Sequence, residues 1–154
     1  MTFQAICKDN YDTLLDMMVR YYRNAEDADT PIYEIVSFIR YLFDLIQQEK
    51  LYGVVAYAPS PVGFVLWMRD SEALPFSELP GLGSIVEIGI EADVRHQGYG
   101  RALVAHAEQN MRLLGVEGFY VSAYGPAEAF WHACGFCDTG HFARNHLPLL
   151  AKPL

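Results

Sequence analysis

A short glycine-containing segment between a strand pattern and a helix pattern is the feature that most constrains this chain. Residues 84–91 have the apolar, β-branched character of a strand, and residues 98–114 place apolar side chains at helical spacing. The segment Arg95-His96-Gln97-Gly98-Tyr99-Gly100 lies between them. A strand that turns directly into a helix brings backbone N–H groups and the positive end of the helix dipole to one point. The segment therefore predicts a phosphate-binding loop.

The residue types in this loop suit contact with phosphate oxygens. Gly98 and Gly100 lack a Cβ and permit close approach of the backbone, while Arg95 and Arg101 supply positive charge. A Rossmann fingerprint would need another glycine near Leu103, and a P-loop would need Lys followed by Ser or Thr, so the spacing excludes both motifs. The alternative is a glycine turn without a ligand, in which His96 meets only solvent.

The remaining pattern predicts a single α/β domain over residues 1–154. A strand over 3–8 precedes a helix capped by Asp9 or Asn10, and a polar linker over 24–29 precedes a second helix. This helix is expected to open with Thr30 as N-cap and Pro31 as its first residue. Its expected buried stripe is Ile32, Ile35, Val36, Ile39, Leu42, Phe43 and Ile46.

The second half of the chain continues with alternating strands and helices. The patterns predict strands over 52–57, 62–68, 84–91 and 119–123, an ordered loop over 70–83, a short helix from Pro126 to Cys134, and one or two closing strands.

Composition limits the partners and the compartment. The chain has 19 acidic and 11 basic residues, and the resulting net charge of -8 opposes a nucleic-acid partner. The apolar runs are too short to span a membrane and the first residues lack the pattern of a secretion signal, so we expect a cytoplasmic protein. Cys134 and Cys137 form a CxxC pair without a second pair to complete a zinc site, so we expect buried thiols and no metal.

The loop and a later segment together resemble the GCN5-related N-acetyltransferase (GNAT) superfamily. That family carries Arg/Gln-x-x-Gly-x-Gly/Ala between its fourth strand and third helix, and residues 95–100 match the pattern in full. Its later Asn-x-x-Ala-x-x-aromatic-Tyr-x-x-x-Gly-Phe pattern is matched in part by residues 124–136, where the residues in register are Ala127, Phe130, Gly135 and Phe136. One predicted helix and one predicted strand separate the two segments, as in the family.

The resemblance implies a GNAT-like acyl-CoA N-acyltransferase fold, with a splayed mixed sheet flanked by about four helices. Acetyl-CoA, the acyl donor, would lie in the opening near the strand that ends at Ile90. The backbone of that strand would bind the pantetheine arm, and the glycine loop would hold the pyrophosphate. The resulting set of expected cofactor contacts is Ile88, Gly89, Ile90, Arg95, His96, Gln97, Gly98, Tyr99, Gly100, Arg101 and Trp131.

The catalytic positions match the family less well. The glutamate that some relatives use as a base falls on Ser84, and Glu87 takes that role only if a bulge changes the alternation of side chains. Otherwise Glu87 is an exposed strand glutamate. Trp131 stands where relatives carry an acidic tyrosine, and an indole N–H cannot protonate a thiolate. Tyr124 replaces the family's asparagine and is either a substitute acid or a packing residue.

These features favour an acetyl-CoA-dependent N-acetyltransferase that acts on a primary amine of a small molecule, peptide or protein. The departures at Ser84, Tyr124 and Trp131 leave a second interpretation open, a non-catalytic acyl-CoA-binding or regulatory module. A third is a structural or dimerisation domain that uses an aromatic surface, and a homodimer is compatible with all three. We expect neither a nucleic acid nor a membrane as partner.

Overall fold

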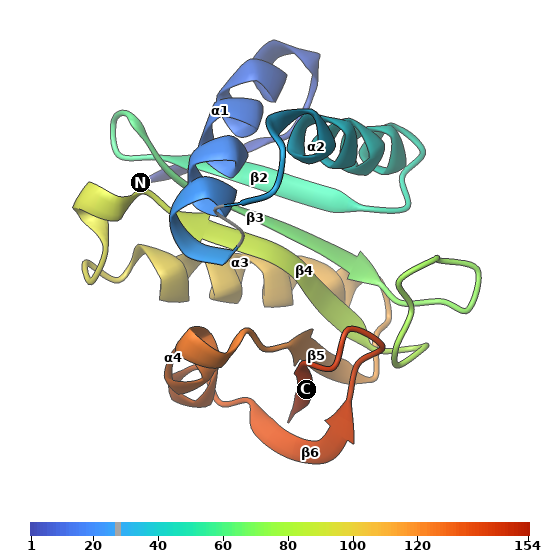
Figure 1. The fold of residues 1–154 in the computed structure, drawn as a ribbon. Helices are drawn as coiled ribbons and strands as arrows, with labels where there is room; N and C mark the ends of the chain where they lie inside the picture. The colour runs from blue at the N-terminus through green and yellow to red at the C-terminus, as the bar shows by residue number, and fades with distance from the viewer. Residues whose placement is uncertain (27–28) are drawn as a thin grey trace. The chain divides into compact units, whose positions relative to one another are not determined.

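The computed structural model describes residues 1–26 and 29–154 (Figure 1). These residues fall into two compact units, one made of Met1–Leu66 and Glu87–Leu103 and the other of Trp67–Val86 and Val104–Leu154. Strands β3 (Pro61–Arg69) and β4 (Gly83–Ile90) and helix α3 (Tyr99–Leu113) contribute residues to both units. The single domain expected over residues 1–154 stays a prediction.

The strands form a mixed sheet in the order β1-β2-β3-β4-β5-β7-β6. Strand β1 (Thr2–Ala5) pairs antiparallel with β2 (Tyr52–Tyr57), and β7 (Pro148–Pro153) pairs antiparallel with β5 (Gly118–Ser122) and β6 (Cys137–Phe142). Strand β4 pairs in parallel with β5 through Gly83 and Ser84, the first residues of β4. The predicted mixed α/β class is confirmed, and the chain closes with two strands.

In the first unit, helices α1 (Tyr11–Tyr21) and α2 (Ile32–Gln47) lie side by side (Figure 1) and meet through Tyr11 and Phe43, whose ring centroids are 4.7 Å apart. Asn10 stands at the N-cap position of α1 as predicted, but its side chain makes no capping bond to this helix. Its Oδ1 accepts the Cys7 N–H and its amide donates to the Ala5 carbonyl, both at 2.9 Å. The buried core of this unit comes from both helices and from β2 and β3, and includes Leu14, Met17, Met18, Ile35, Ile39, Leu42, Leu45, Val54, Val55, Val62, Phe64, Val65 and Leu66.

Three details of these helices differ from the sequence-based expectation. Pro31 is extended at ψ 140° and is itself the N-cap, so α2 begins at Ile32 and the expected Thr30 cap is wrong by one residue. Ile32 is 53% exposed because the buried stripe of α2 is rotated toward Leu45, which was not expected to be buried. The expected linker over 24–29 is wrong at its start, because a π-helical turn over Tyr22–Glu26 continues α1; residues 27 and 28 lie outside the described residues.

In the second unit, a buried carboxylate organises the loop over residues 70–82. The Oδ2 atom of Asp70 accepts hydrogen bonds from the backbone N–H groups of Glu78 at 3.0 Å and Leu79 at 2.8 Å, and from the Tyr120 hydroxyl at 2.7 Å. The Asp70 N–H also donates to the Leu82 carbonyl at 2.8 Å. A carboxylate buried to this degree requires such partners, so these bonds order the loop, as the sequence predicts.

The substitution Tyr120→Phe is expected to lower the free energy of unfolding by roughly 1.5–3 kcal/mol, because it removes a donor from a buried carboxylate. Burial, reinforced by the bond to Asp70, raises the pKa of Tyr120 above its usual range. The folded protein then holds the phenol proton more tightly than the unfolded chain, so the free energy of unfolding should fall as pH rises above about 10. Tyr120→Phe should flatten that fall.

Urea unfolding of the wild type and Tyr120→Phe at about pH 7 and pH 10.5 measures both effects. Tyr33→Phe removes an exposed tyrosine hydroxyl and is the control. Equal stability of wild type and Tyr120→Phe at neutral pH would contradict the assignment of Asp70 as a buried, hydrogen-bonded anchor.

Candidate functional site

The predicted phosphate loop joins β4 to α3 in the first unit. The Gly98 carbonyl accepts the Ala102 N–H at 3.1 Å, so the N–H groups of Tyr99, Gly100 and Arg101 precede the hydrogen-bond ladder of α3. Such N–H groups, at the positive end of a helix dipole, are suited to an anion. The phosphate contact itself stays a prediction.

The loop has a left-handed backbone at two positions. His96 has φ 63° and Gly98 has φ 88°. A Cβ at Gly98 would meet no atom within 4 Å, so open space lies beside the backbone at this point. A non-glycine residue in this conformation, here the exposed His96, is uncommon, although histidine adopts it more readily than most residues.

Arg95 opens the loop and is tied to the end of β4. Its Nε donates to the Ile90 carbonyl at 3.3 Å, while most of the side chain is exposed. Gln97 and Arg101 are also exposed, whereas Tyr99 and Gly100 are partly buried. The two arginines are accessible to an anion at the start of α3.

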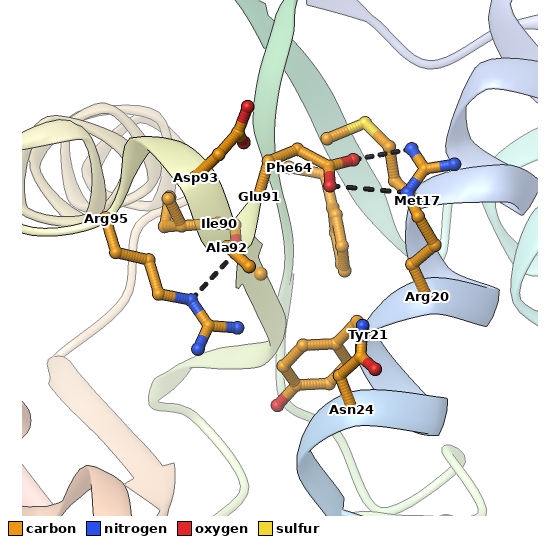
Figure 2. Close-up of a pocket in the computed structure, with 11 residues that line it drawn as sticks. Met17, Arg20, Tyr21, Asn24, Phe64, Ile90, Glu91, Ala92, Asp93 and Arg95 are labelled. Carbon is orange, nitrogen blue, oxygen red and sulfur yellow. Dashed lines mark hydrogen bonds and ion pairs between the residues drawn. The ribbon is translucent and has the colours of Figure 1, made fainter.

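A cavity of about 180 Å³ lies beside the end of β4 (Figure 2). Its walls come from α1, the following π-helical turn, β3, the end of β4 and the residues after it, and include Arg20, Tyr21, Phe64, Gly89, Glu91 and Arg95. Arg20 and Glu91 form a bidentate pair, with Nη2 2.6 Å from Oε1 and Nε 3.3 Å from Oε2. This bond raises the pKa of Arg20 and ties α1 to the start of the loop. Three expected cofactor contacts thus line one cavity: Gly89, Ile90 and Arg95.

Two aromatic side chains approach the backbone of β4 closely at Gly89. A Cβ there would lie 2.5 Å from Cε1 of Phe64 and 3.2 Å from Cδ2 of Tyr21. These two rings meet edge to face at a centroid distance of 6.0 Å. A glycine inside a strand pattern is a sequence signal of such a close approach, although the sequence does not identify the partner.

Glu87 lies on the same face of β4 as Gly89, because side chains two residues apart in a strand point the same way. It is partly buried, and its Oε1 accepts a hydrogen bond from the Tyr22 hydroxyl at 2.5 Å. Ser84 is 4% exposed and bonds to the Tyr120 hydroxyl in the second unit. The bulge that would bring Glu87 into the register of Ser84 stays a prediction.

The remaining expected site residues, Tyr124 and Trp131, belong to the second unit. Trp131, in helix α4 (Glu128–Ala133), is 5% exposed and packs against Phe130 and Phe136 at centroid distances of 5.0 and 5.4 Å. Tyr124 is partly buried and caps the 3-10 turn that precedes α4. Their roles toward a cofactor stay predictions.

The thiols differ from the expectation. Cys7 and Cys137 are exposed and Cys134 is half-buried, because Cys134 follows the end of α4 and Cys137 begins β6, the last strand in the sheet order. Within residues 1–26 and 29–154, no group of three or more His, Cys, Asp or Glu side chains is arranged to hold a metal ion. No helix in the described part of the chain is both long and apolar enough to cross a membrane.

The fold and the loop define a class: a mixed-sheet α/β protein with a glycine-containing turn between its fourth strand and third helix. The model of the acetyltransferase (GNAT) family matches residues 11–136. The chain belongs to this family, and the resemblance of residues 95–100 and 124–136 is thereby confirmed.

Solved structures share this fold at low sequence identity. The PaiA N-acetyltransferase of Thermoplasma acidophilum in complex with coenzyme A is 14% identical, with all of both chains covered and a TM-score of 0.74. The ribosomal-protein-alanine N-acetyltransferase of Brucella melitensis is 17% identical, again with full coverage and a TM-score of 0.71. AAC(6')-Iy, in complex with the bisubstrate analogue CoA-S-monomethyl-acetylneamine, is 13% identical over 90% of this chain and 91% of its own, with a TM-score of 0.70. No curated protein matches the sequence significantly.

Proposed function

We propose that the protein transfers the acetyl group of acetyl-CoA to a primary amine of a small molecule, peptide or protein. The observation that carries this proposal is the β4–α3 loop, whose left-handed Gly98 borders open space at the positive end of α3. Family membership supports the reaction class, and the structures of relatives with coenzyme A or a coenzyme A conjugate support the donor. The proposed cofactor site needs no metal.

The proposed chemistry is direct attack. The amine nitrogen forms a bond to the thioester carbonyl carbon, the carbon–sulfur bond breaks, and coenzyme A leaves as a thiolate that takes up a proton. Glu87 is the candidate base that removes a proton from the amine, and backbone N–H groups at Ile88 to Ile90 are the candidate donors to the oxyanion. Tyr124 is the candidate acid. Water is the alternative proton source, because a thiolate with a pKa near ~8.5 is a good leaving group.

The acceptor is a primary amine whose identity depends on groups outside the shared loop. The net charge of -8 favours approach of a cationic amine. A homodimer is compatible with this function.

A second candidate is an acyl-CoA-binding or regulatory module without turnover. Two observations favour it: the Glu87 carboxylate already accepts the Tyr22 hydroxyl, and the buried Trp131 stands in the register of the family's acidic tyrosine. Such a module would bind acetyl-CoA without releasing thiol.

Acetyl-CoA and free coenzyme A are each expected to raise the melting temperature, because a ligand that binds only the folded state stabilises it. The gain is about 2.7 kcal/mol at a concentration 100 times Kd. The absence of a thermal shift at saturating ligand would contradict both candidate functions. Thiol release with a panel of amines and peptides then separates them: release that depends on the acceptor supports the transferase, and silence across the panel supports the binding module.

A further inference from the structure

Two consecutive tyrosines at the end of α1 contact the same face of β4. The Tyr21 ring lies over Gly89, and the Tyr22 hydroxyl bonds to Glu87 two residues earlier in the strand. Successive residues of a regular α-helix point about 100° apart and do not normally share a target. Here α1 ends at Tyr21 and a π-helical turn begins at Tyr22, and such turns often occur at functional sites.

The ring of Tyr22 is held from two sides. It meets Tyr21 at a centroid distance of 5.4 Å and Phe38 of α2 at 6.2 Å, both edge to face. These contacts fix the orientation of the ring and offset the side-chain entropy that it loses. The hydroxyl is directed at Oε1 of Glu87. At 2.5 Å, the bond has the length of a charge-assisted O–H···O⁻ interaction.

We propose that Tyr22 is the positioning residue for Glu87: its hydroxyl holds the carboxylate in one orientation, in its ionised form, on the β4 face that carries Gly89. This inference rests on the proposed acetyl transfer, in which Glu87 removes the proton from the amine. A donor to the ionised form keeps a carboxylate available as a base at lower pH, at the cost of some basicity. Tyr22 would thus set the lower pH limit of the reaction.

The charges around Glu87 are compatible with a dominant effect of Tyr22. Glu91 follows the end of β4, and its carboxylate is paired with Arg20 of α1. Tyr21, the last residue of α1, presents its ring to Gly89 and Phe64. The Tyr22 hydroxyl, by contrast, binds the Glu87 carboxylate directly.

The test is Tyr22→Phe, which removes the hydroxyl and retains the ring that packs on Tyr21 and Phe38. The first readout is independent of turnover: the ionisation of Glu87 is followed by ¹³C NMR of labelled glutamate carboxyls, with the signal assigned through Glu87→Gln. We expect the titration midpoint of Glu87 to move to higher pH by roughly one pH unit. The second readout is the pH profile of kcat/KM, whose acidic limb should move by the same amount.

Tyr33→Phe is the matched control. It removes the hydroxyl of an exposed tyrosine that also lies near a glutamate, Glu34, at 3.5 Å, and should move neither readout. An unchanged Glu87 titration in Tyr22→Phe would overturn the pairing itself. A moved titration with an unmoved pH profile would overturn the positioning role and leave a purely structural bond. If the wild type binds acetyl-CoA without turnover, the proposed transfer and the positioning role are both contradicted. The Glu87 titration still tests the Tyr22–Glu87 pairing in that case.

Discussion

Replacing Gly98 with alanine is expected to weaken acetyl-CoA binding by roughly 10- to 100-fold. At φ 88° an L-residue is strained by on the order of 1–3 kcal/mol. We expect the exposed loop of the variant to relax to another backbone when it is free, so binding must restore the strained one and loses that free energy. The added Cβ would also project into the open space beside the loop, where we propose that phosphate binds. Isothermal titration calorimetry with acetyl-CoA measures the change.

Gly115, just after the other end of α3, provides a matched control. It has φ 73°, and a Cβ there would also meet no atom within 4 Å. Gly115→Ala should therefore cost a similar amount of folding stability without a change in affinity. Equal affinities of the wild type and both variants would show that the loop does not hold the cofactor.

Replacing Glu87 with glutamine should lower kcat/KM by about 10²- to 10⁴-fold, the range that a general base contributes. The glutamine carbonyl can still accept the Tyr22 hydroxyl, so the local geometry is expected to survive while the capacity to take up a proton is lost. The loss should be largest at low pH, because more of the amine is already deprotonated at high pH. Acetyl-CoA affinity should not change.

The control for Glu87→Gln is Glu117→Gln, which removes the same charge from an exposed side chain in the turn before β5. Steady-state thiol release over a range of pH compares the two variants with the wild type. An unchanged rate and pH profile in Glu87→Gln would exclude Glu87 as the base. The two predictions are tested separately, because Gly98→Ala should change the affinity for acetyl-CoA and Glu87→Gln should change turnover.

Local patterns predicted much of the fold. The boundaries of β2 and of the β4–α3 turn agree with the structure to within a residue or two, because the preference for strand or loop is decided by neighbouring residues. The end of α1 was predicted less well. The π-helical turn over Tyr22–Glu26 replaces part of an expected polar linker, and polar composition alone does not distinguish a helical turn from a linker.

Interactions between residues far apart in the sequence could not be predicted from local patterns. Asp70 in a loop and Tyr120 in a strand both fit their local patterns, and their hydrogen bond joins residues 50 apart in sequence. Arg20 and Glu91 are 71 residues apart. Neither pair has a spacing that a sequence motif can specify.

The sequence by itself determined the loop over residues 95–100 and the family. Glycine sterics and the start of a helix depend on neighbouring residues, so both can be recognised in the order of residues along the chain. Only the tertiary structure decided that Glu87 has a partner. Tyr22 is 65 residues away, begins the π-helical turn that follows α1, and donates its hydroxyl to Glu87. The physical reason is range: backbone conformation follows from neighbours along the chain, whereas a pair of side chains depends on how whole elements pack.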